Sequence, residues 1–235
     1  MRAIDWSSDE GFRVAYLAGD ELRVVTGDGV TDRAVGPAAN VKPAWQPESD
    51  PEAAIHRVTY VDRLNRIANV DTDSGRVVWR TNVYSKPVRS LEWSADGERL
   101  LIVAGDFATV QSSGGGPILK GPIATGVDHA TISPDGSAVA VVSSGPKGTE
   151  LKLFGDTEPV RRLYSSGRGN PSAEFEPPVF SPDGEWILMP WLDADQWLFV
   201  NTEDERVTAV ADIARQFDAD GKGEAGFPDV AGWCC

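Results

Sequence analysis

Cysteine is nearly absent from this chain, and its placement limits what it can do. The only two cysteines, Cys234 and Cys235, are adjacent and terminal, so they cannot staple distant segments into a disulfide framework. A strained vicinal disulfide, a metal contact and simple burial all fit the pair. We expect two buried free thiols, since an unpaired cysteine behaves as a small hydrophobic residue.

Long apolar runs are also missing, and basic residues are outnumbered by acidic ones. No window approaches about 18 apolar residues, and Asp5, Asp9 and Glu10 stand where a secretory signal would need an apolar run. We therefore expect a soluble chain that does not itself insert into a membrane. Acidic residues number 36 against 22 basic ones, giving a net charge of −14 and a pI near 4.5. Such a surface repels phosphate backbones, which argues against a nucleic-acid partner.

Turn-forming residues, by contrast, are abundant. The chain has 24 glycines and 16 prolines, with 41% apolar and 25% charged residues. These proportions indicate a globular chain with many turns between short elements.

One short phrase recurs along the chain and organises it. A large apolar residue is followed by Ser-Pro-Asp-Gly or a relative of it, and the opening residues lie 39, 48, 39 and 48 apart. The copies begin at Trp6, Trp45, Trp93, Ile132 and Phe180, and a partial copy lies at 230–233. Proline presets the first corner of a turn, aspartate bonds the backbone two residues on, and glycine takes the left-handed position. Each phrase therefore predicts a hairpin between two strands.

The strands after these turns are apolar on both sides, which predicts a sheet covered on both faces. They occupy 13–17, 57–61, 99–103, 138–142 and 186–189, and two further short runs follow each one. A four-stranded unit with two apolar faces is stable only between two neighbours, which favours radial stacking. The fold class predicted is an all-β propeller with five discernible four-stranded blades, at about 1–40, 41–87, 88–126, 127–174 and 175–214 of a single domain.

These residues carry a family resemblance. The apolar-Ser-Pro-Asp-Gly turn, with a later strand ending Asp71-x-x-Ser74-Gly75, resembles the WD40-like repeats of the bacterial TolB propeller family. The first two copies depart from it, since Glu10 replaces the turn glycine and 46–49 keep only the proline. The Gly-His and Trp-Asp signature of eukaryotic WD40 repeats is absent. The resemblance implies a propeller that binds a protein or peptide. It also implies a periplasmic or extracytoplasmic location if a signal or anchor precedes the given sequence, a location that the N-terminus as given does not support.

The five predicted blades end at about residue 214 and leave residues 215–235 unassigned. An acidic loop is expected at 215–229 and a lone closing strand at 230–235. One hypothesis is an N-terminally shortened ring of six or more blades; the other is a five-bladed ring whose last strand joins the first blade.

Catalytic and metal-binding patterns are weak. Gly-x-Ser-x-Gly does not occur, His56 lies in a polar turn, and His129 stands beside Asp128 as the single histidine of its neighbourhood. The aspartates Asp96, Asp135 and Asp183 are expected to serve their turns. A calcium loop starting at Asp218, Asp220 and Glu224 is opposed by Lys222 at an oxygen-ligand position and by Asp229 where glutamate belongs. We therefore predict no catalytic, cofactor or metal residues.

Loops and aromatic residues supply the remaining candidates. The loop 111–126 contains three consecutive glycines, at 114–116, but no Lys-Ser/Thr pair follows them, so it is not a phosphate loop. Asp5 and Glu92 each precede a first-strand tryptophan and could add negative potential near the axis. A small basic island, which could capture an anion, consists of Arg161, Arg162 and Arg168. An aromatic cluster, expected in the core and alternatively a ligand platform, consists of Trp186, Trp191, Trp197 and Phe199.

The sequence thus favours a non-catalytic scaffold for proteins or peptides. The alternative is an enzyme or ligand-binding propeller with its site at the central channel.

Overall fold

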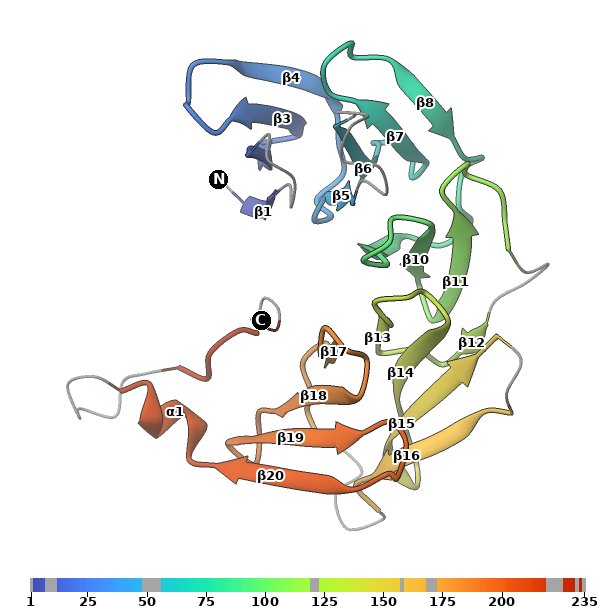
Figure 1. Cartoon of the computed structure of the whole chain (residues 1–235), viewed down its shortest axis with the longest axis vertical. Coiled ribbons are helices and arrows are strands. Elements are labelled where there is room, and N and C mark those ends of the chain that lie inside the picture. Colours follow the sequence, from blue (N-terminus) through green and yellow to red (C-terminus); the bar gives the residue numbers. More distant parts are fainter. Residues whose placement is uncertain are drawn as a thin grey trace. The chain divides into compact units, whose positions relative to one another are not determined.

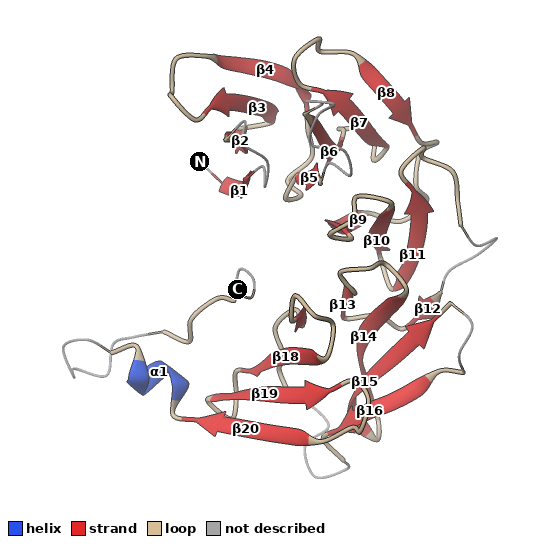
Figure 2. Cartoon of the chain, viewed as in Figure 1, coloured by secondary structure: helices blue, strands red, loops and turns tan. Residues whose placement is uncertain are grey.

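The computed structural model describes residues 2–6, 12–47, 56–118, 123–156, 159–167, 173–218, 226–230 and 233. The chain forms two compact units, Met1–Thr125 and Gly126–Cys235. Strands make up nearly all of the described regular structure, and a single short helix is described near the C-terminus (Figures 1 and 2).

The first unit contains three four-stranded antiparallel sheets, each a meander in which neighbours in sequence are neighbours in the sheet. The first sheet consists of β1 (Arg2–Trp6), β2 (Arg13–Ala18), β3 (Glu21–Thr26) and β4 (Asp32–Pro37). The second consists of β5 (Ala44–Gln46), β6 (Arg57–Val61), β7 (Ile67–Asp71) and β8 (Val77–Arg80). The third consists of β9 (Val88–Trp93), β10 (Arg99–Ala104), β11 (Phe107–Ser112) and β12 (Ala124–Thr125).

The second unit contains two sheets of the same kind and the helix. The fourth sheet consists of β13 (His129–Ile132), β14 (Ala138–Gly145), β15 (Gly148–Gly155) and β16 (Arg161–Ser165). The fifth consists of β17 (Val179–Phe180), β18 (Trp186–Trp191), β19 (Gln196–Asn201) and β20 (Val207–Ala211). The helix α1 (Ile213–Gln216) follows directly, so the expected loop from 215 begins as a helical turn.

The predicted unit of four strands is therefore confirmed five times over, with strand bounds within a few residues of those expected. The prediction that the second strand of each sheet is buried on both faces is confirmed in four sheets. In these, β6, β10, β14 and β18 each contain a run of four or more buried residues. β2 differs, because its burial alternates: Ala15 and Leu17 are buried whereas Val14 and Tyr16 are half-buried. β2 therefore covers only one of its faces fully.

Hydrophobic clusters join neighbouring sheets face to face within each unit. One cluster packs Leu17 and Val24 of the first sheet against Val58 and Tyr60 of the second. A second cluster joins the second and third sheets. In the second unit, Leu151 and Val142 pack against Ile187 and Met189, both fully buried. Sheets that share a core in this way stabilise one another, as the repeat pattern predicted.

Candidate functional site

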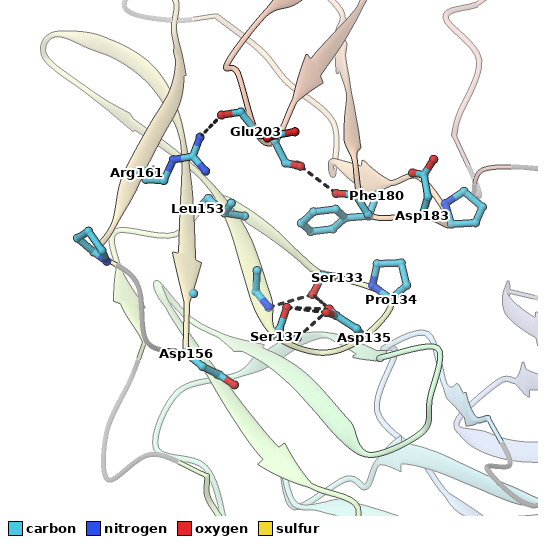
Figure 3. A pocket seen from close by; sticks show the side chains of 16 residues that line it. Ser133, Pro134, Asp135, Ser137, Leu153, Asp156, Arg161, Phe180, Asp183 and Glu203 are labelled. Atoms are coloured by element: carbon cyan, nitrogen blue, oxygen red, sulfur yellow. Dashed lines mark hydrogen bonds between the residues drawn. The ribbon is translucent and has the colours of Figure 1, made fainter.

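A cavity of about 500 Å³ opens between the fourth and fifth sheets of the second unit (Figure 3). Its walls are the turn between β13 and β14, the turn between β17 and β18, and the chain that follows β15 and β19. Two copies of the Ser-Pro-Asp-Gly phrase therefore line one hollow.

Local chemistry makes these turns rigid. The hydroxyl of Ser133 donates a hydrogen bond to the Asp135 carboxylate over 2.7 Å and accepts one from the Ala138 N–H over 2.9 Å. The Ser137 N–H donates to the same carboxylate over 3.0 Å, and Gly136 takes a φ of 72°. The turn between β17 and β18 repeats this pattern of bonds. Fixed turns of this kind hold the cavity rim in place without a ligand.

The base of the cavity is apolar. Leu153 and Phe180, both more than 90% buried, line it from the fourth and fifth sheets. Three prolines, at 134, 159 and 182, add further apolar surface. A ligand side chain entering here would gain apolar burial below and meet polar groups at the rim.

The rim is predominantly acidic. Its carboxylates belong to Asp135, Asp156, Asp183 and Glu203, and its one cation is Arg161. The hydrogen bond from the Ser133 hydroxyl lowers the pKa of Asp135, and that from the Ser181 hydroxyl lowers the pKa of Asp183. Both groups therefore stay ionised at neutral pH and give the cavity a negative potential.

Arg161 is already engaged. Its Nη2 donates to the main-chain carbonyl of Glu203 over 2.8 Å (Figure 3). The same atom lies 3.4 Å from the Glu205 carboxylate. Arg162, the next residue, instead lies 3.5 Å from Glu150. The structure thus does not bring these two members of the expected basic island together, because adjacent residues of a strand point to opposite faces. Arg168 lies outside the described residues.

The expected aromatic cluster is divided among several partners, and all four members are half-buried. Trp191 packs with Phe175 at the edge of the core, at 5.3 Å between ring centroids. The Arg206 guanidinium lies 5.2 Å from the Trp186 ring. Trp197 packs on Phe217, and Phe199 packs on Trp233. Packing is thus the role seen for each ring, although only Trp191 borders the core cluster.

The histidines take separate positions. His129 is half-buried at the start of β13, opposite Val142, and the carboxylate of its neighbour Asp128 accepts the Ser144 N–H over 2.6 Å. His56 is half-buried directly before β6, and its carbonyl accepts the Thr72 N–H over 2.8 Å. Among the described residues, no group of three or more histidine, cysteine, aspartate or glutamate side chains could hold a metal ion.

Of the other site residues predicted from the sequence, Asp5 and Glu92 have defined positions in the structure. Asp5 accepts the Trp45 N–H over 2.9 Å and pairs with Lys42 over 3.1 Å, so it joins the first two sheets. Glu92 is half-buried in β9. Asp220, Glu224, Cys234 and Cys235 lie outside the described residues, so the calcium and cysteine hypotheses stay predictions. In the expected closing strand, only Val230 and Trp233 are described, and neither is in a strand.

Sequence reasoning missed the cavity. It assigned Asp135 and Asp183 to their turns alone, and it could not place Glu203 beside Arg161. A signal was present: two consecutive copies of the phrase keep both proline and aspartate, and equivalent turns of stacked sheets lie at the same end. No described helix is both long and apolar enough to cross a membrane.

Four-stranded antiparallel meanders, repeated five times and packed face to face within each unit, define a β-propeller fold. Several solved structures have a similar fold. TolB from Acinetobacter baumannii matches with a TM-score of 0.56 at 18% identity, covering 88% of this chain and 53% of that one. Kluyvelomyces marxianus Hsv2 matches with a TM-score of 0.65 at 12% identity, covering 88% and 61%.

Kuenenia stuttgartiensis hydrazine synthase matches with a TM-score of 0.59 at 16% identity, covering 88% of this chain and 65% of that one. The chain thus spans between about half and two thirds of these solved chains. No family model matches the sequence, and no curated protein does. The structural likeness therefore establishes the fold, and the predicted resemblance to TolB-like propellers is confirmed at that level.

Proposed function

We propose that this protein is a non-catalytic propeller that binds proteins or peptides, and that the cavity between the fourth and fifth sheets is a contact site. The observation that carries the proposal is a rim of four carboxylates above an apolar base, built on two rigid turns. Binding sites on β-rich scaffolds commonly use loops held by a fixed framework, which is what these turns provide.

The ligand chemistry follows from the lining. A lysine or arginine side chain has an apolar stem and a charged head, so the stem can lie on Leu153 and Phe180 while the head meets Asp183 and Glu203. A volume of about 500 Å³ suits one or two side chains of a peptide. The occupant we propose is a basic segment of a partner protein with an apolar residue beside the cation.

Two further parts of the proposal come from resemblance. The chain acts as a single propeller domain, and it works outside the cytoplasm, as TolB-like repeats imply. The acidic surface, with a net charge of −14, supports a basic partner because it speeds the approach of cationic surfaces.

The test is a binding titration with fluorescent peptides that carry Lys or Arg next to Leu or Phe, compared with the same peptides carrying Glu. We expect the basic peptides to bind and the affinity to fall as salt rises. Replacing both Asp183→Asn and Glu203→Gln should weaken binding by about tenfold, or about 1.4 kcal/mol. The fold is spared, because asparagine keeps an oxygen that can accept the turn bonds.

A matched control lies in the third sheet. Asp96→Asn makes the same change in an equivalent turn that does not line the cavity, and it should leave the affinity unchanged. Equal affinity for basic and acidic peptides, or equal loss in the control and the double variant, would contradict the proposed site.

A further inference from the structure

The outer strands of the first four sheets carry features that discourage pairing with another chain. β4 contains Asp32, Arg33 and Pro37, and its pairing with β3 is interrupted by a bulge. β8 ends in Arg80 and is bulged against β7. β12 has only two residues, and β16 has two arginines and a bulge against β15. Charge, proline, bulges and short length are the usual means of blocking an exposed sheet edge.

The outer strand of the fifth sheet has none of these features. β20 reads Val-Thr-Ala-Val-Ala, without charge or proline. It pairs with β19 in an unbroken register over all five residues, and every residue of it is exposed, with Val207 at 39% and Val210 at 37%. Such an edge presents a regular row of main-chain donors and acceptors to which a further strand can add. The Ala211 carbonyl at its end already accepts the Gln216 side-chain amide over 3.0 Å, so this one bond must give way when a strand adds.

The residues on either side of β20 identify the strand that fits. An antiparallel copy of β20, centred on Ala209, places Val207 opposite Ala211 and Thr208 opposite Val210. One step further out, the same register places Arg206 of each copy opposite Asp212 of the other. We propose that two copies of this chain pair through β20 about a two-fold axis at Ala209, closed at each end by an Arg206–Asp212 ion pair.

Arg206 and Asp212 directly flank β20 at its two ends, so this register brings each of them next to the opposite charge of the other copy. Arg206 is held there by the Trp186 ring, at 5.2 Å. Asp212 ends the strand with a φ of 58°, and its carboxylate makes no capping bond to α1. A charged pair at both ends of a closed, isologous contact explains why the partner is a second copy.

The dimer we infer is weak. A pair of five-residue strands buries little area, which places it among transient contacts. The net charge of −14 on each copy adds a long-range repulsion that physiological salt largely screens. This inference is independent of the proposed peptide site, because β20 does not line the cavity.

The experiment is sedimentation analysis of the whole chain between about 1 μM and about 1 mM, the range in which weak contacts saturate. We expect a reversible monomer–dimer equilibrium. Ala209→Lys places two like charges together at the axis and should weaken the dimer more than tenfold. Val77→Lys, an exposed position in β8, is the matched control and should leave the equilibrium unchanged.

A charge exchange tests the register itself. Arg206→Glu faces Glu against Asp at both ends, and Asp212→Arg faces Arg against Arg, so each variant alone should dimerise about tenfold more weakly. Mixed together, the two variants face Glu against Arg at one end and Asp against Arg at the other, so the heterodimer should recover the original affinity. Circular dichroism and thermal unfolding check that each variant folds.

Any one of four results would overturn the inference. The unaltered chain could remain monomeric up to about 1 mM, the dimer could persist in Ala209→Lys, or the mixed variants could fail to associate. Pairing of β20 only with a strand of different sequence would also overturn it, since the inferred occupant is a second copy.

Discussion

Trp45 and Asp5 hold the first two sheets together by two hydrogen bonds. The main-chain N–H of Trp45 donates to the Asp5 carboxylate over 2.9 Å, and its indole N–H donates to the Asp5 carbonyl over 3.0 Å. Lys42 adds an ion pair to the same carboxylate over 3.1 Å, but its side chain is 55% exposed. Asp5, which precedes Trp6 in the sequence, thus joins the first sheet to the second.

Asp5→Ala should lower the free energy of unfolding by about 1–2 kcal/mol, because it leaves the main-chain N–H of the buried Trp45 without its acceptor. Lys42→Ala should cost less than about 0.5 kcal/mol, because exposed ion pairs contribute little. Urea unfolding followed by tryptophan fluorescence measures both. Equal losses would show that the ion pair, and not the hydrogen bond, holds this contact.

Thr59 is the acceptor at the centre of a buried polar contact between the second and third sheets. Its hydroxyl is fully buried and accepts the Asn69 amide over 2.9 Å and the Trp93 indole N–H over 3.1 Å. Thr59→Val keeps the shape but leaves two buried donors unsatisfied, so it should cost about 2–4 kcal/mol. Thr59→Ser keeps the hydroxyl and should cost about 1 kcal/mol. A Val variant as stable as the Ser variant would contradict this account.

Two equivalent glycines should differ in their tolerance of a side chain. Gly97 and Gly184 close matching turns with φ values of 70° and 74°, so alanine costs about 1 kcal/mol at either position through strain. At Gly97 the added carbon would also press on the carbonyl of Pro47, whereas at Gly184 it would meet only Pro134, at 3.8 Å. Gly97→Ala should therefore destabilise more in urea unfolding. Equal losses would mean that the Pro47 chain moves aside freely.

Stability at acid pH should depend on the Ser133 hydroxyl. That hydrogen bond lowers the pKa of Asp135 in the folded chain. A carboxyl group whose pKa is lower in the folded chain stabilises the fold at pH values above its unfolded pKa of about 3.9. This stabilisation is lost as the pH falls through the folded pKa. Ser133→Ala should therefore raise the pKa of Asp135 measured by carboxyl-carbon NMR.

The same variant should also unfold at higher pH in an acid titration. Its loss of stability should shrink as pH falls, because protonated Asp135 no longer gains from the hydroxyl. An unchanged pKa in the variant would show that the backbone N–H and the hydroxyl of Ser137 are enough to hold the carboxylate.

The turns and strands of this protein follow from its local sequence. The Ser-Pro-Asp-Gly copies predicted hairpins, and runs such as residues 99–103 predicted strands buried on both faces, because turn preferences and apolar patterns act over a few residues. The period of about 40 residues then required stacked sheets, and the described residues form five sheets that pack on one another within each unit.

Other features depend on contacts between residues far apart in the chain. Arg161 meets the carbonyl of Glu203 across two sheets, and turns 48 residues apart form one cavity. Arg161 and Arg162 look like one basic island in sequence, yet strand alternation sends them to different acidic partners. The exposed edge of β20 is equally invisible in sequence, since its apolar residues resemble those of a buried strand. Sequence determines the turns and strands through local preferences; tertiary packing decides which turns meet, which charges are neutralised and which edge stays open.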